Sequence, residues 1–180
     1  MRTSSQDADR TKKLAISSAF LCAALMLSLA EAFVFPAGIL PIPGTKLGLA
    51  NSAVLLCATL MGRRYAAAVS LSRVVLMFFL FGSGTSVIYA LSGAVLSFVG
   101  IALFCNSTRL SFLGKSVIAA ILHNTAQIMC AAFILGQSVL LLFPWMTLSA
   151  VLCGSITGIL LNLSYGPVKK YAGSILRIKT

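Results

Sequence analysis

Long apolar stretches that can each cross a bilayer constrain this fold more than any other feature of the sequence. Residues 115–136 form one of them. It matches the roughly 20 residues that a helix needs to span a hydrocarbon core of about 30 Å. Hydrophobic residues make up 59% of the 180-residue chain and charged residues only 9%, whereas about 25% of residues are charged in a typical soluble domain. The sequence therefore predicts an all-α integral membrane protein.

Six apolar stretches predict a bundle of six transmembrane helices. The connection at 36–44 contains three prolines and two glycines, which exclude regular helix there. The second stretch is short for a span, so we extend it back through Lys46, whose ammonium can reach the interface. The chain then divides into an N-terminal tail at 1–13, a transmembrane domain at 14–165 and a C-terminal tail at 166–180. The six predicted spans are 14–35, 47–61, 66–81, 86–104, 115–136 and 145–165.

Basic residues divide the connections into two sets, which gives the predicted orientation. The N-terminal tail, the tight turn at 62–65, the segment 109–115 and the C-terminal tail are basic, whereas the alternate connections contain only Lys46. Because basic connections stay on the cytoplasmic side, both termini are predicted to be cytoplasmic in a multi-pass protein of the bacterial inner membrane. The net charge of +11 is spread over short clusters between apolar stretches, so we expect contact with membrane lipid and not with nucleic acid.

A secretory signal peptide is the rival interpretation of the first apolar stretch. Basic residues precede it, and Ala30, Glu31 and Ala32 resemble a cleavage site. However, further spans follow in place of a mature soluble domain, so we expect this helix to be retained.

The five cysteines do not indicate a metal site or a cofactor. They are widely spaced, odd in number and mostly inside apolar stretches, and no pair has the spacing of metal ligands. With a single histidine in the chain, too few ligands remain for zinc. We interpret the cysteines as small buried hydrophobic residues: Cys22, Cys57, Cys105, Cys130 and Cys153.

Polar side chains inside the apolar stretches are the candidates for function. His123 and Gln127 lie one helical turn apart, with Asn124 beside them. Polar and ionisable groups at membrane depth are costly unless they face a protein interior or a wet cavity. The alternative is that they only hold neighbouring helices together by hydrogen bonds.

Two charged residues favour a binding site over simple helix packing. Arg73 lies at the centre of its predicted span, where a charge costs about 2.5 to 3.5 kcal/mol on insertion scales. Glu31 is the only acidic residue in any span and could meet Arg73 through water or a ligand. The predicted pocket lies in the outer half of the bundle. Its residues are Glu31, Asn51, Arg73, His123, Asn124 and Gln127.

Small residues at helical spacing predict surfaces of close helix contact. Ala15, Ala19 and Ala23, here called the alanine strip, recur every four residues and so stack on one face of the first span. Gly154 and Gly158 form a similar strip in the last span. Because alanine is common in membrane helices, the alanine strip fits internal packing as well as an external partner.

Three features together resemble one known family. They are Pro43-Gly-Thr-Lys-Leu-Gly-Leu-Ala-Asn51, Arg73 in the third span and His123-Asn-Thr-Ala-Gln127. The chain resembles, from residue 14 to 165, the Gx transporter family, also called heptaprenyl diphosphate synthase component I. That family is similar to the substrate-binding S components of energy-coupling-factor (ECF) transporters.

The resemblance implies a six-helix bundle that captures a small molecule from outside. A membrane coupling subunit and cytoplasmic ATPases would drive uptake, and the alanine strip is similar to the face that S components offer to the coupling subunit. A vitamin-like compound or an isoprenoid or quinone precursor would fit as substrate.

Two other classes of function stay open. One is a noncatalytic membrane component of heptaprenyl diphosphate synthesis, and the other is a structural assembly subunit. Prenyl chain elongation needs acidic residues to hold magnesium and diphosphate, and this chain has three acidic residues, of which two lie in the N-terminal tail. We therefore expect no enzyme activity from this chain alone. Neighbouring genes for ATPases or for a catalytic synthase would distinguish the classes.

Overall fold

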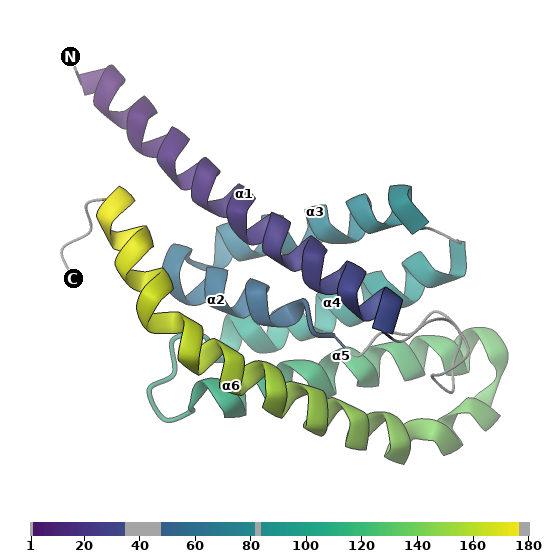
Figure 1. The fold of residues 1–180 in the computed structure, drawn as a ribbon. Coiled ribbons are helices and arrows are strands. Elements are labelled where there is room, and N and C mark those ends of the chain that lie inside the picture. Colours follow the sequence, from purple (N-terminus) through teal and green to yellow (C-terminus); the bar gives the residue numbers. More distant parts are fainter. Residues whose placement is uncertain (1, 35–47, 82–83, 177–180) are drawn as a thin grey trace.

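The computed structural model describes residues 2–34, 48–81 and 84–176, and every element in these ranges is helical (Figure 1). The predicted loop at 36–44 and Lys46 lie outside the described residues. The all-α prediction is confirmed. The elements are α1 (Arg2–Val34), α2 (Asn51–Met61), α3 (Arg63–Phe81), α4 (Gly84–Phe104), α5 (Phe112–Leu135), the 3₁₀ helix η1 (Gln137–Leu142) and α6 (Phe143–Leu176).

Four of the helical segments are long and apolar enough to cross a membrane, which supports a membrane protein. By contrast, α2 has 11 residues, fewer than the roughly 20 that span a hydrocarbon core. Helix α3 has 19 residues but includes Arg63, Arg64 and Arg73. The count of six spans and their orientation therefore stay predictions. The four segments are Asp9–Phe33, Val87–Phe104, Phe112–Leu135 and Gln137–Ile175.

Glycine and a side-chain cap set several helix ends. Gly62 and Gly136 have φ values of 95° and 99° and follow the ends of α2 and α5, a conformation that glycine adopts without steric cost. Because Gly62 alone makes the turn, the predicted basic turn at 62–65 was too long: Arg63 already belongs to α3. Ser111 caps the start of α5 by accepting a hydrogen bond from the Gly114 amide.

Both predicted tails continue the neighbouring helices. Helix α1 begins at Arg2, well before residue 14, and α6 extends to Leu176 with Pro167 inside it. The N-terminal part of α1 and the C-terminal part of α6 project from the same end of the bundle (Figure 1). The tail boundaries at 13 and 166 therefore do not coincide with helix ends.

Helices α5 and α6 approach so closely that glycine is required between them. A Cβ atom on Gly154 would lie 2.7 Å from the Cα of Val117, and one on Gly158 would lie 2.5 Å from the Cα of Leu113. Both distances are shorter than real Cβ contacts. This confirms the predicted close-packing strip in the last span.

The surface of the bundle is as apolar as its interior. Phe79, Phe133 and Leu141 are highly exposed, as expected of side chains that face lipid. Of the cysteines, Cys57 and Cys105 are buried as predicted. Cys22 is exposed, so its predicted burial was wrong; it lies on a face of α1 that no described helix covers.

Candidate functional site

Five of the buried polar side chains, from four helices, are predicted site residues in the bundle interior. We call them the polar cluster. Their exposed fractions range from 0% for Gln127 to 6% for Arg73. Helix α1 supplies one of them, α2 one, α3 one and α5 two. The members are Glu31, Asn51, Arg73, His123 and Gln127.

The charged part of the polar cluster joins the last turn of α1, the start of α2 and the middle of α3. The Glu31 Oε1 atom accepts a hydrogen bond of 2.8 Å from the Gly48 amide. Arg73 Nη2 donates to Asn51 Oδ1 at 3.5 Å, and the negative charge of Glu31 acts on the guanidinium of Arg73. Glu31 and Arg73 line the same small cavity, and Asn51 joins Arg73 through its hydrogen bond; a meeting of Glu31 and Arg73 through water or a ligand stays a prediction.

His123 is held by its own helix and by two glycines. Its Nε2 atom lies 3.1 Å from Nε2 of Gln127, one turn along α5. Because an amide nitrogen donates, this imidazole nitrogen accepts. A Cβ atom on Gly93 would lie 2.6 Å from the ring, and one on Gly48 would lie 3.4 Å from it. The imidazole therefore fits against α4 only because residue 93 is glycine, whereas the distance at Gly48 is that of an ordinary contact.

A small cavity of about 20 Å³ lies within the polar cluster. A volume of that size holds about one water molecule, whereas pockets for small molecules measure about 300 to 1,000 Å³. The described conformation is therefore closed to a vitamin-sized compound. The polar residues that line the cavity are Ser28, Glu31, Arg73 and His123, together with Gly48.

Two buried donors of the polar cluster have no hydrogen-bond partner in the described ranges. They are Arg73 Nε and Asn51 Nδ2. An unsatisfied buried donor costs about 1 to 3 kcal/mol. Both groups donate, so a ligand that satisfies them must offer an acceptor such as a carbonyl, carboxylate or phosphate oxygen.

Asn124 does not join the polar cluster, although it neighbours His123 in sequence. Its Nδ2 atom donates a hydrogen bond of 2.8 Å to the Met146 carbonyl oxygen. This contact ties α5 to the first turns of α6. Its predicted role in ligand binding stays a prediction.

Sequence reasoning missed the contributions of Gly48, Gly93 and Ser28. As a small residue in the middle of an apolar stretch, Gly93 indicates close packing of a neighbouring group. The sequence does not show which group that is. Only the arrangement of the helices identifies the His123 ring as that partner.

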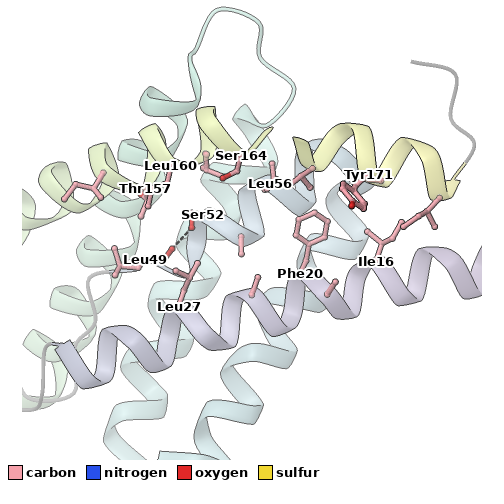
Figure 2. Close-up of a pocket in the computed structure, with 18 residues that line it drawn as sticks. Ile16, Phe20, Leu27, Leu49, Ser52, Leu56, Thr157, Leu160, Ser164 and Tyr171 are labelled. Carbon is pink, nitrogen blue, oxygen red and sulfur yellow. Dashed lines mark hydrogen bonds between the residues drawn. The ribbon is translucent and has the colours of Figure 1, made fainter. Parts of the chain in front are cut away.

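The alanine strip lies on an open face. All three alanines are exposed, and Ala19 and Ala23 line an apolar groove of about 660 Å³ between α1, α2 and α6 (Figure 2). We call it the α1/α6 groove. Nothing in the described ranges covers it, so the strip is accessible to a partner or to lipid.

The comparison with family models decides the family. A model described as heptaprenyl diphosphate synthase component I matches residues 20–163. The chain belongs to this family. The matched range includes the whole polar cluster, with Gly48 and Gly93, so these features lie inside the part that the heptaprenyl diphosphate synthase component I family shares. Ala15 and Ala19 precede it. Neither a curated protein nor a solved structure matches the chain.

Proposed function

We propose that this member of the heptaprenyl diphosphate synthase component I family is a noncatalytic binding subunit in the bacterial inner membrane. It would bind a small molecule at the polar cluster and serve as the substrate-binding subunit of an ECF-type importer. The observation that carries the proposal is the burial of Glu31, Arg73 and His123 around one cavity. Burying ionisable groups at membrane depth is costly, and a bundle held together by apolar contacts and glycine approaches has no need of them.

The two unsatisfied donors support a substrate with an oxygen acceptor. Arg73 Nε and Asn51 Nδ2 would receive this group, and the guanidinium favours a carboxylate or phosphate over a neutral carbonyl. An isoprenoid or quinone precursor, or a vitamin with an acidic group, meets this requirement.

Binding then requires the closed cavity to widen. The hydrogen bond from the Gly48 amide to Glu31 links the last turn of α1 to the start of α2. We propose that substrate separates these two ends, because Glu31 and Gly48 both line the cavity.

The alanine strip would dock a membrane coupling subunit, with cytoplasmic ATPases behind it. Replacement of Ala15, Ala19 and Ala23 by leucine should abolish co-purification of the coupling subunit and the ATPases from native membranes. The matched control is Cys22→Leu, because Cys22 is exposed on the same helix but does not line the α1/α6 groove. Unchanged co-purification in the triple variant would contradict this part of the proposal.

The second candidate is a noncatalytic membrane component of heptaprenyl diphosphate synthesis. The family description favours it, since the name component I implies a second, catalytic component. The same co-purification separates the two candidates. Recovery of a soluble prenyl synthase in place of ATPases would support the second one and reject the importer.

A further inference from the structure

The α1/α6 groove is an apolar hollow of about 660 Å³ in the described part of the chain. Helices α1 and α6 form its walls and α2 forms its floor (Figure 2). Four hydroxyl groups line it, and two of them are already satisfied: Ser52 donates to the Leu49 carbonyl oxygen, and Thr157 to that of Cys153. The groove therefore offers an occupant mainly apolar contact.

The α1 wall of the groove is about as long as one leaflet of a bilayer is thick. Its α1 wall runs from Ile16 to Leu27, which is about 16 Å at a rise of 1.5 Å per residue. Half of a hydrocarbon core measures about 15 Å. One hydrocarbon chain of a lipid, lying along α1, would therefore reach from the interface to the middle of the membrane, while the α6 wall continues further, from Ile156 to Ile175.

Positive charge lies at only one end of the groove. Ile16 and Tyr171 mark that end (Figure 2), toward the N-terminus of α1. Lys12 and Lys13 lie one helical turn before Ile16, on the α1 face that lines the groove. The Lys12 side chain is half-buried and the Lys13 side chain is exposed. No charged side chain lines the groove itself, and at the opposite end the charged residue one turn beyond Leu27 is the buried, acidic Glu31.

Other charges near this end leave it positive. Lys169 and Lys170 follow Val168 on α6 and are exposed, so they add positive charge beside the groove. Asp9 lies a further turn along α1, away from the apolar part. Basic pockets between membrane helices bind anionic lipid headgroups, and each lysine near the surface contributes about a factor of five in affinity.

We propose that the α1/α6 groove binds one anionic phospholipid from the leaflet at the helix termini. One acyl chain lies between α1 and α6, and the phosphate lies at Lys12 and Lys13. The acyl chain contacts the apolar part of the groove, and the positive charge of the lysines attracts the anionic headgroup. This site is separate from the polar cluster, but it shares Ala19 and Ala23 with the surface proposed to dock the coupling subunit, so the lipid would occupy the groove only while the coupling subunit is absent.

The test uses the full-length protein reconstituted in phosphatidylcholine vesicles with a minor fraction of phosphatidylglycerol. The protein is extracted in mild detergent, and the lipids that remain bound are counted by mass spectrometry. We expect retained phosphatidylglycerol well above its share in the vesicles. The double variant Lys12→Gln/Lys13→Gln should weaken its apparent affinity about 10- to 30-fold, from the contribution of two lysines.

Two controls keep the test specific. Arg63→Gln/Arg64→Gln removes two exposed charges that are remote in the chain from the α1/α6 groove and do not line it, and should leave retention unchanged. Ala23→Phe fills the groove and should lower retention of both headgroups, whereas Cys22→Phe should not.

Three results would overturn the proposal. They are retained lipid with the composition of the vesicles, equal loss in both double variants, and full retention in Ala23→Phe. Displacement of phosphatidylglycerol from the wild-type protein by added farnesyl diphosphate would also overturn it, since it would assign the groove to a prenyl diphosphate.

Discussion

Removal of the Arg73 charge should destabilise the protein mainly through the carboxylate that it leaves behind. Arg73→Gln deletes the long hydrogen bond to Asn51 (3.5 Å) and the positive charge that acts on Glu31. Glu31 is only 2% exposed, so water cannot replace the lost charge. Breaking one partner of a buried charged pair costs about 3 to 5 kcal/mol, and we expect a loss of unfolding free energy in that range.

The double variant Glu31→Gln/Arg73→Gln removes both charges at once. The side-chain amide introduced at position 31 can still accept the hydrogen bond of 2.8 Å from the Gly48 amide through its oxygen. The double variant should therefore be more stable than Arg73→Gln alone, with a coupling energy of about 1 to 3 kcal/mol between the two sites.

Thermal unfolding of the purified protein in detergent, followed by far-ultraviolet circular dichroism, measures this difference. Ser116→Ala is the control for loss of a buried polar group, because its hydroxyl pairs with Thr157 at 2.7 Å outside the polar cluster. Additive effects of the two single substitutions would refute the argument, since they would mean that Glu31 and Arg73 do not interact.

Three further predictions concern packing and topology. Gly93→Ala should displace the His123 ring and lower the melting temperature in the same assay; an unchanged melting temperature would contradict the ring's placement against α4. Gly158→Ala should lower the free energy of unfolding by about 1 to 3 kcal/mol through overpacking against Leu113. Gly166→Ala is the control, because a Cβ atom there meets no atom within 4 Å and should cause no steric destabilisation. Cysteines introduced near each terminus of a cysteine-free variant should react only with membrane-permeant reagent; labelling of either one from outside would reject the predicted orientation.

The sequence predicts local relations well, because helical periodicity fixes them. The pairing of His123 with Gln127 follows from their spacing of one turn, and their hydrogen bond confirms it. The close approach at Gly158 follows in the same way from small residues on one helical face.

Relations between helices could not be predicted, because periodicity gives no register of one helix against another. The contact of Gly93 with His123 and the hydrogen bond of Arg73 with Asn51 both depend on that register. Asn124 shows the limit clearly. Its position beside His123 suggested a shared role, but it lies far enough round α5 to reach α6 instead.

The predicted tails at 1–13 and 166–180 stay predictions of membrane boundaries, and the helices continue through both of them. Polar residues at 2–13 indicated a tail outside the membrane, but polarity does not oppose helix formation. Alanine, lysine and arginine are good helix formers, so α1 continues through the polar segment to Arg2. The membrane boundary and the helix end are therefore different positions in this chain.

The central claim is that the polar cluster binds a small molecule, and the most direct measurement is mass spectrometry of compounds that co-purify with the protein. We predict that the wild-type protein retains a compound with an acidic or carbonyl group. Arg73→Gln and His123→Ala should lose it while they remain folded, whereas Ser116→Ala should retain it. Recovery of the same compound from all four proteins, or of none from the wild-type protein after extraction from native membranes, would contradict the claim.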